Sequence, residues 1–304
     1  MKRIAPSQLF ASLFTLATAL LLSASMWGQS YNFEIVKYPA NNPADQFTQL
    51  LGINDALQIA GYHNFNQNSG FTLQLPNGFT TENYPNSMMT QVIGINNTGT
   101  TVGFYVDNNN VTHGFSDTNG KFATVDYPGT PFNQLLGQND MGQAAGYYSL
   151  SPDNTTPDFP YVYDEKGAVF QVITIPQAAQ GAQATGVNNT QQICGFYIDS
   201  NGINHGFLLN FGQLTTLDPQ GSVFTQALGL NNKGQVVGQW MDAGNNTHGF
   251  VWTAQNGFTT VDTPEGVGTT VVNGINDDGI LVGFYGQAPI NTGFVGYPNP
   301  AQAR

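Results

Sequence analysis

Residues Gln226–Trp240 have the sequence QALGLNNKGQVVGQW, and this stretch decides the fold of the chain. It combines a short apolar run that contains a glycine, the turn Asn232-Lys233-Gly234, and a second apolar run that ends in an aromatic residue. The pattern occurs six times, and consecutive copies start 42, 43, 49, 43 and 45 residues apart, at Gly52, Gly94, Gly137, Gly186, Gly229 and Gly274. A fixed period of this size predicts an array of stacked units, because one unit cannot bury its apolar faces alone.

The fifth copy indicates four strands in each unit. We expect strands at Gln226–Asn231, Gln235–Trp240, His248–Trp252 and Phe258–Asp262, because each is a short apolar run bounded by turn residues. Four antiparallel strands repeated with this period predict an all-β, six-bladed β-propeller. A proline ends the fourth strand of every copy, as is typical of edge strands: Pro39, Pro85, Pro128, Pro176, Pro219 and Pro264.

Counting strands predicts how the array closes. The mature chain opens with one fourth strand, Phe33–Pro39, and its last unit has three strands, ending with Thr292–Tyr297. We therefore expect the N-terminal strand to complete the last blade, so that no open edge is exposed. The predicted organisation is a secretory signal peptide at 1–28, one propeller domain at 31–298 and a tail at 299–304.

The N-terminus and the charge limit the location and partners of the protein. Two basic residues followed by the apolar run Leu9–Leu22 and small residues predict a cleaved signal peptide and a secreted or periplasmic protein. Beyond residue 28 the chain has five basic and 19 acidic residues, a net charge of −14. Such a chain repels nucleic acid and anionic membranes, so we expect neither partner, and no membrane association after cleavage. The single cysteine, Cys194, occupies a position that holds Ala or Val in the other copies, which predicts a buried apolar residue.

The repeated Gly-Ile-Asn-Asn-x-Gly-x-Val-Val-Gly phrase and the His-Gly-Phe triplets at 113–115, 205–207 and 248–250 resemble the HAF repeats of bacterial extracellular proteins. Members of that family have His-Ala-Phe at this position, whereas here the middle residue is glycine and three units lack the histidine. The resemblance extends over nearly the whole mature chain. It implies export and a repeat array, but it transfers no catalytic residue.

Loops between the second and third strands supply the first candidate site. In a propeller these loops share one face with the inter-blade connections, so three acids and three histidines are predicted on that face: Asp107, His113, Asp199, His205, Asp242 and His248. One interpretation is a cation or glycan site, since hard ions and sugars need oxygen ligands and hydrogen-bonding groups. The other is that each Asp caps its own turn and each His braces its loop. We favour the second for the loops and expect no metal site and no cofactor.

Aromatic residues end the second strand of nearly every unit, at His63, Tyr105, Tyr148, Tyr197, Trp240 and Tyr285. Either these rings stack on sugars, or they fill the wedge between neighbouring blades. We favour the wedge, and we expect the glycine two residues before each ring to leave room for it. Tyr148 and Trp240 are nevertheless included in the candidate ligand-binding face. The third unit also carries the longest insertion, Ser149–Asp158, in the position where loops often bind ligands.

Catalytic motifs are missing from the sequence. Only four glutamates occur, and Glu34 and Glu82 fall on outer strands, so no unrepeated carboxylate pair of a glycosidase is evident. No Gly-x-Ser-x-Gly, His-Glu-x-x-His or phosphate-loop motif occurs. We therefore expect a monomeric binding scaffold, with a glycan or cell-surface ligand. The alternative is a carbohydrate-active hydrolase or lyase that uses acids of the loop face.

Overall fold

The computed structural model describes residues 31–39, 47–64, 66–155, 157–287 and 289–299. The predicted signal peptide and most of the predicted tail lie outside these residues. The described part of the chain forms 24 strands and no helix, so it has no helix that is long and apolar enough to cross a membrane. The strands of the first three units are β2 (Phe47–Ile53), β3 (Gln58–Asn64), β4 (Asn68–Gln74), β5 (Gly78–Thr81), β6 (Met89–Ile95), β7 (Thr101–Val106), β8 (Thr112–Thr118), β9 (Lys121–Thr124), β10 (Phe132–Gln138), β11 (Gln143–Ser149), β12 (Asp158–Asp164) and β13 (Val169–Val172).

The remaining units continue this order, and the predicted strands of the fifth unit are confirmed to within two residues. The prolines follow the fourth strands rather than lie within them, because each strand ends a few residues earlier. The strands of the last three units are β14 (Ala182–Val187), β15 (Ile193–Ile198), β16 (Asn204–Asn210), β17 (Gln213–Leu217), β18 (Phe224–Leu230), β19 (Val236–Met241), β20 (Thr247–Thr253), β21 (Gly257–Val261), β22 (Val271–Ile275), β23 (Leu281–Gln287), β24 (Ile290–Pro298) and, from the N-terminus, β1 (Tyr31–Val36).

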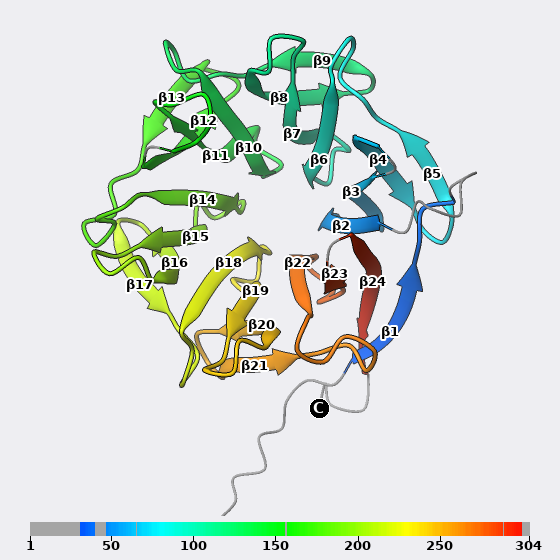
Figure 1. Cartoon of the computed structure of the whole chain (residues 1–304), viewed down its shortest axis with the longest axis vertical. Helices are drawn as coiled ribbons and strands as arrows, with labels where there is room; N and C mark the ends of the chain where they lie inside the picture. Colours follow the sequence, from blue (N-terminus) through cyan, green and yellow to red (C-terminus); the bar gives the residue numbers. More distant parts are fainter. Residues whose placement is uncertain (1–30, 40–46, 65, 156, 288, 300–304) are drawn as a thin grey trace, which may run out of the picture.

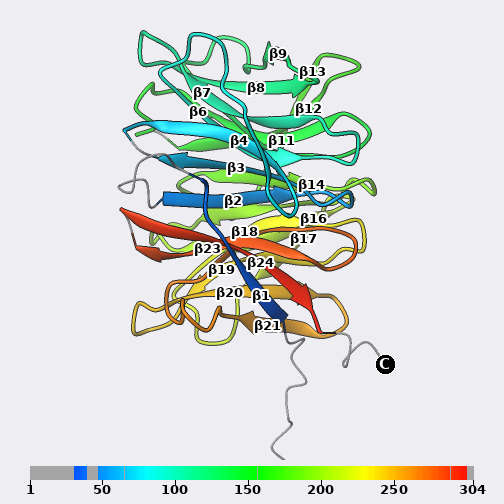
Figure 2. The same ribbon diagram turned by 90° about the vertical axis from the view of Figure 1, so that its right-hand side faces the viewer.

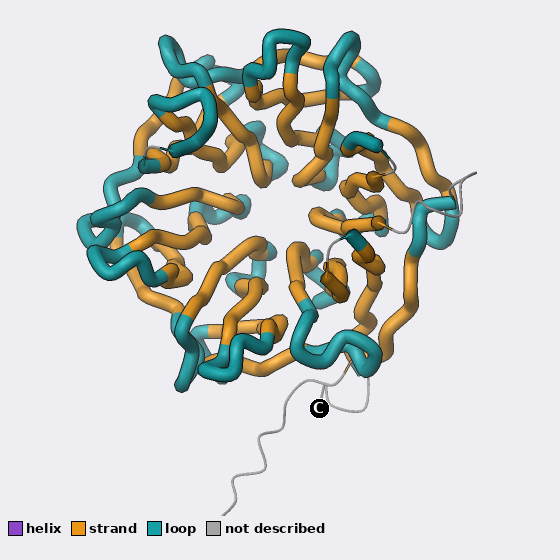
Figure 3. Tube along the Cα trace, in the orientation of Figure 1, coloured by secondary structure: helices purple, strands orange, loops and turns teal. Residues whose placement is uncertain are grey.

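These strands form four-stranded antiparallel sheets, which we call blades 1 to 6 in the order above, arranged around a common axis (Figure 1). The first strand of each blade lies at the axis and the fourth at the periphery, with the connecting loops at the two ends of the strands (Figure 3). Single parallel pairs connect some neighbouring blades, such as Phe132 with Thr112. The predicted all-β fold of four-stranded antiparallel sheets is thereby confirmed.

The N-terminal strand β1 pairs antiparallel with β24, from Tyr31 opposite Pro298 to Val36 opposite Gly293. Blade 6 thus consists of β22, β23, β24 and β1, and Figure 2 shows β1 beside β24. Apolar side chains accompany this pairing, since Phe33 packs edge-on against Phe294 at 5.5 Å between ring centroids. The sequence prediction that residues from the two ends share one sheet is correct.

Glycines in the second strands create space for a different side chain from the one expected. A Cβ atom at Gly103 would lie 2.0 Å from the carbonyl oxygen of Gln91 and 3.0 Å from the ring of Phe115. Gly195 and Gly238 are similarly confined by Phe207 and Phe250. The prediction that these glycines make room for the aromatic ring two residues later is therefore wrong: they make room for the phenylalanine of the third strand and for a bulge in the first.

Two rings of hydrogen bonds connect the six blades near the axis. The asparagine of each repeat accepts two backbone N–H groups of its own turn; Asn139 Oδ1, for example, accepts from Met141 at 3.0 Å and Gln143 at 2.9 Å. Its Nδ2 group donates to the carbonyl of the corresponding asparagine in the next blade. These inter-blade bonds are 2.9–3.3 Å long and join Asn54, Asn96, Asn139, Asn188, Asn231, Asn276 and again Asn54.

The residue after each of these asparagines forms the second ring. Its backbone N–H donates to the side-chain oxygen of the next blade at 2.7–2.9 Å, through Asp55, Asn97, Asp140, Asn189, Asn232, Asp277 and back to Asp55. The buried asparagine carbonyls of the first ring and the more exposed N–H groups of the second ring both find hydrogen-bond partners in this way. We refer to these two sets together as the axial rings.

The core lies in the wedges between neighbouring blades, where both sheet faces are covered. Cys194 is fully buried in the wedge that also contains Leu217, Val236 and Phe250. Burial raises the pKa of its thiol to about 12. The predicted role of this cysteine as a small buried apolar residue is confirmed.

Candidate functional site

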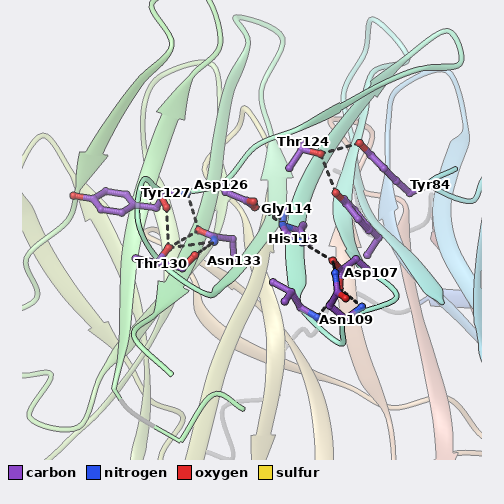
Figure 4. Close-up of polar contacts among 12 residues, drawn as sticks. Tyr84, Asp107, Asn109, His113, Gly114, Thr124, Asp126, Tyr127, Thr130 and Asn133 are labelled. Atoms are coloured by element: carbon purple, nitrogen blue, oxygen red, sulfur yellow. Dashed lines mark hydrogen bonds and ion pairs between the residues drawn. The ribbon is translucent and has the colours of Figure 1, made fainter. Parts of the chain in front are cut away.

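Three blades carry the same Asp–His–Asp cluster. Its first aspartate follows the second strand, its histidine lies on the third strand, and its second aspartate follows the fourth strand. In blade 2, His113 Nδ1 lies 2.6 Å from Asp126 Oδ2, and His113 Nε2 lies 3.8 Å from Asp107 Oδ2 (Figure 4). Blades 4 and 5 repeat this arrangement with nearly the same distances. The clusters are Asp107–His113–Asp126, Asp199–His205–Asp218 and Asp242–His248–Asp262.

The first aspartate of each cluster is a turn cap. Asp107 Oδ1 accepts from the backbone N–H groups of Asn109 and Val111, both at 2.8 Å. The hydrogen bond from Val111 is the main cause of the lowered pKa of Asp107, and the pKa of Asp242 is lowered to about 2, mainly by Asn246. These contacts agree with the interpretation that Asp caps the turn and His braces the loop. In the described part of the chain, no group of three or more His, Cys, Asp or Glu residues is arranged to hold a metal ion.

Sequence reasoning missed the second acid of each cluster. Asp126, Asp218 and Asp262 follow the fourth strand and reach the histidine of the same blade. A signal for them existed, since each acid follows its histidine by 13 or 14 residues and precedes a proline closely. In blade 1, which has Ser69 at the histidine position, Asn83 takes the place of the acid and accepts from the backbone N–H of Gly70 at 2.9 Å.

The predicted aromatic residues pack between blades. Tyr105 stacks on Tyr84 of the preceding blade at 3.7 Å between centroids and 6° between planes, and Tyr148 stacks on Tyr127 at 4.2 Å. Trp240 stacks on His248 at 4.8 Å, and its indole N–H is buried without a hydrogen-bond partner. The wedge interpretation is therefore confirmed for Tyr105 and Tyr148, which stack on rings of the preceding blade, whereas Trp240 stacks on His248 of its own blade.

The eight predicted ligand-binding residues do not form one cluster. They occupy the same face but belong to four blades: Asp107 and His113 to blade 2, Tyr148 to blade 3, Asp199 and His205 to blade 4, and Trp240, Asp242 and His248 to blade 5. Each group is braced by contacts within its own blade or with the adjacent one. A ligand common to all of them would have to extend across this face.

A funnel of about 410 Å³ lies on the axis and supplies a site that the sequence analysis missed. Its walls include apolar and aromatic side chains such as Leu51, Leu136, Tyr62 and Phe104. Its polar lining consists of five glutamines at the same position of the first strands and, two residues further along those strands, Thr185 and Asn273: Gln49, Gln91, Gln134, Gln183 and Gln226 form the ring of carboxamides. Each glutamine stands three residues before the repeated glycine, so the alternation of strand residues turns it toward the axis. Deeper along the axis the repeated glycines allow the first strands to approach one another. The adjoining cavity at this level has a volume of only about 80 Å³.

One carboxylate approaches the rim of this funnel. Asp158 Oδ2 accepts from Gln183 Nε2 at 2.6 Å, while Asp158 Oδ1 is buried without a partner. Burial raises the pKa of Asp158 to about 6. Asp158 ends the insertion of the third unit that the sequence analysis singled out, so this insertion places an acid next to the carboxamide ring.

No protein-family model matches this chain, and no curated protein matches it significantly. Solved structures do resemble it. SapL1 lectin in complex with alpha methyl fucoside has a TM-score of 0.53 at 11% sequence identity, with 80% of this chain and 89% of that chain covered. The fungal lectin from Aleuria aurantia, described as a six-bladed β-propeller with a novel fucose recognition mode, has a TM-score of 0.52 at 9% identity, covering 82% and 92%.

TolB from Acinetobacter baumannii is a third similar structure, with a TM-score of 0.54 at 12% identity, covering 77% of this chain and 63% of that chain. At such low identities the resemblance shows the fold alone. The arrangement of blades around the axis is that of the six-bladed β-propellers.

Proposed function

We propose that this protein is a carbohydrate-binding scaffold that takes a neutral glycan at the face carrying the axial funnel and the Asp–His–Asp clusters. The observation that carries the proposal is the funnel itself. Its carboxamide groups both donate and accept hydrogen bonds, as sugar hydroxyls require, and its aromatic walls suit the apolar faces of sugar rings. Concave sites of this size with a few convergent polar groups are typical of ligand pockets.

Charge and the similar structures support a neutral sugar. The net charge of −14 beyond residue 28 disfavours anionic ligands, and Asp158 adds an acid at the rim. The two lectins of similar fold are described with fucose or a fucoside. For the present chain a fucose-like sugar is therefore a natural first ligand to test.

Binding fits this face better than catalysis does. Asp107, Asp199 and Asp242 lie in three different blades, and each is occupied by the backbone of its own turn. A retaining or inverting glycosidase needs two carboxyl groups on either side of one bond. The three loop acids are therefore suited to shaping a binding surface, and we place a hydrolase or lyase second.

We further propose that the protein is exported, as the N-terminal sequence predicts, that it belongs to the HAF-repeat proteins, and that it acts as a monomer. In this proposal β1 closes the ring by completing blade 6. Support comes from the pairing of β1 with β24 and from the return of both axial rings to blade 1, where Asn276 Nδ2 donates to Asn54 at 3.3 Å.

Isothermal titration calorimetry with soluble neutral oligosaccharides, including fucosylated ones, tests the proposed function. Gln91→Ala and Gln134→Ala should each weaken binding by about tenfold or more if the funnel holds the sugar, because each removes hydrogen bonds to hydroxyls. Trp240→Ala and Asp242→Ala test the loop face in the same way. Gln213→Ala, an exposed glutamine that does not line the funnel, is the matched control. If no neutral glycan binds, or if binding survives all four changes, the proposal is wrong.

A further inference from the structure

The wedge between blades 1 and 2 differs from the other five wedges at three corresponding positions. It carries Glu82 after β5, Thr101 at the start of β7 and Asp117 on β8. In the wedge between blades 3 and 4, the corresponding residues are Ile173, Ile193 and Leu209. The registers match: Thr101 lies opposite Asp117 as Ile193 lies opposite Leu209, and the N–H groups of Glu82 and Ile173 both donate to the third strand. The remaining wedges have apolar or aromatic residues or glycine at these positions.

Both carboxyl groups are buried, and that of Asp117 is incompletely bonded. Glu82 is 9% exposed and Asp117 is 7% exposed. Glu82 Oε1 accepts a short hydrogen bond from the Thr101 hydroxyl. Asp117 binds the backbone N–H groups of Gly120 and Lys121, but its Oδ1 atom has no partner. A buried acceptor without a donor costs free energy, so the unused oxygen of Asp117 requires an explanation.

Burial favours the neutral form of both acids. It is the main cause of the raised pKa of Glu82, which is about 7, and the nearby charge of Asp117 also contributes to this rise. The other side chains that line the wedge here are uncharged, including Thr80, Asn83 and Asn119. The ion pairs found in the described residues belong to histidines and involve neither acid. Below about pH 7 the wedge therefore offers an O–H donor on Glu82 beside the carboxyl group of Asp117.

These groups line a pocket of about 310 Å³. The wedge between blades 3 and 4 holds a pocket of nearly the same size, about 320 Å³, but with Ile173, Ile193 and Leu209 in its wall. The size of the pocket therefore comes from the packing of two blades, which is repeated around the ring. The carboxyl groups of Glu82 and Asp117 occur only in the wedge between blades 1 and 2. The volume exceeds that of one ion or a few waters, at about 30 Å³ for each water, and suits a ligand with several hydroxyl groups.

We propose that the pocket between blades 1 and 2 is a second, unrepeated binding site for a sugar or polyol, held through two adjacent hydroxyl groups. One hydroxyl donates to the carboxyl group of Asp117, and its neighbour accepts from the carboxyl group of Glu82. The site uses none of the residues of the axial funnel. It differs from a metal site because only two carboxyl groups meet here, and one is already bonded to Thr101.

The proposal is tested by titrating the full mature chain with L-fucose, D-glucose, D-galactose, myo-inositol and calcium chloride, followed by calorimetry and by ligand-observed NMR. Asp117→Asn and Glu82→Gln keep the shape of each side chain, and each should weaken binding of the hydroxyl ligand by about tenfold or more. Asp117→Leu copies Leu209 of the apolar wedge; it should fold and should abolish binding at this site. Gln213→Ala, at an exposed glutamine outside both pockets, should leave binding unchanged.

Three results would overturn the inference. The first is that no sugar or polyol of the panel binds, and the second is that binding is unchanged in Asp117→Asn and Glu82→Gln. The third is that calcium raises the melting temperature of the wild type but not of Asp117→Asn, which would make the pair a cation site. If Gln134→Ala alone removes sugar binding, the funnel proposal stands and the wedge proposal fails. If only the two wedge variants remove it, the wedge site is supported and the funnel site is contradicted.

Discussion

Replacing Glu82 by glutamine should make the protein more stable at alkaline pH and leave its stability nearly unchanged in acid. The pKa of Glu82 is raised from its ordinary value of 4.5 to about 7, chiefly by burial. An unfolded glutamate ionises above about pH 4.5, whereas the folded state keeps the proton until about pH 7. The stability that the neutral Glu82 contributes is therefore complete below pH 4.5 and is lost as the pH rises through 7.

The size of the effect follows from the same values. One pKa unit corresponds to about 1.4 kcal/mol, so a rise from 4.5 to about 7 corresponds to about 3 kcal/mol of unfolding free energy. Glutamine has nearly the same shape, can still accept from the Thr101 hydroxyl, and stays neutral. We therefore expect Glu82→Gln to match the wild type near pH 4 and to exceed it by about 3 kcal/mol near pH 8.5.

Urea unfolding of both proteins at a series of pH values measures this difference. The comparison must be made between the two proteins, because Asp158 also has a raised pKa, about 6, and destabilises the wild type in an overlapping pH range. Glu165→Gln, which changes an exposed glutamate after β12, is the matched control for the loss of one carboxylate. A difference between Glu82→Gln and the wild type that does not change with pH would refute the reasoning.

Three further predictions concern ring closure, the axial rings and calcium. A chain that starts at Asp45 lacks β1 and exposes the edge of β24; it should aggregate and melt at a lower temperature, and equal solubility and melting temperature would contradict the proposed closure. Asn139→Ala removes two turn bonds and the bond to Asn188, so urea unfolding should show a loss of about 2–4 kcal/mol, and a loss below about 1 kcal/mol would show that these bonds contribute little. Millimolar calcium added after chelation should barely change the melting temperature, because the turn aspartate of each cluster already accepts hydrogen bonds from backbone N–H groups of its own loop. A shift of many degrees would mean that the loops bind calcium.

The strands and their order could be predicted because they depend on local signals. Apolar runs separated by Asn-x-Gly turns repeat with nearly constant spacing, and Gly234 adopts the positive φ of 74° that its turn requires. The pairing of β1 with β24 also follows from counting strands in the first and last units. Neither inference needs knowledge of which side chains meet across two blades.

The axial rings and the funnel could not be predicted, because they depend on how closely the first strands approach. The repeated asparagine is visible in every copy, but its bond to the next blade spans 42–49 residues between neighbouring units. The glutamines of the funnel recur almost as regularly, but a single strand does not reveal which of its faces meets the axis. Repetition in the sequence shows that these residues matter, but it does not show what they contact.

The carboxyl pair in the wedge between blades 1 and 2 could not be predicted for a different reason. The sequence places Glu82 on an outer strand, away from any predicted site, yet its side chain is buried against Thr101 of the next blade. Its neighbour Asp117 is 35 residues further along the chain and belongs to another unit. Departures from the repeat are easily found in the sequence, but only the packed wedge shows that two of them are adjacent.

The axial rings also give the molecule one structurally unique seam. Five of their six inter-blade steps join residues 42–49 positions apart, whereas the step from blade 6 to blade 1 joins residues 222 positions apart. Bringing distant segments together costs more chain entropy than joining neighbours. The last step therefore forms at the greatest entropic disadvantage and should be the first to open in a thermal fluctuation. Although the ring has near sixfold symmetry, amide exchange in the axial rings should therefore be fastest between blades 6 and 1, at the step from Asn276 to Asn54.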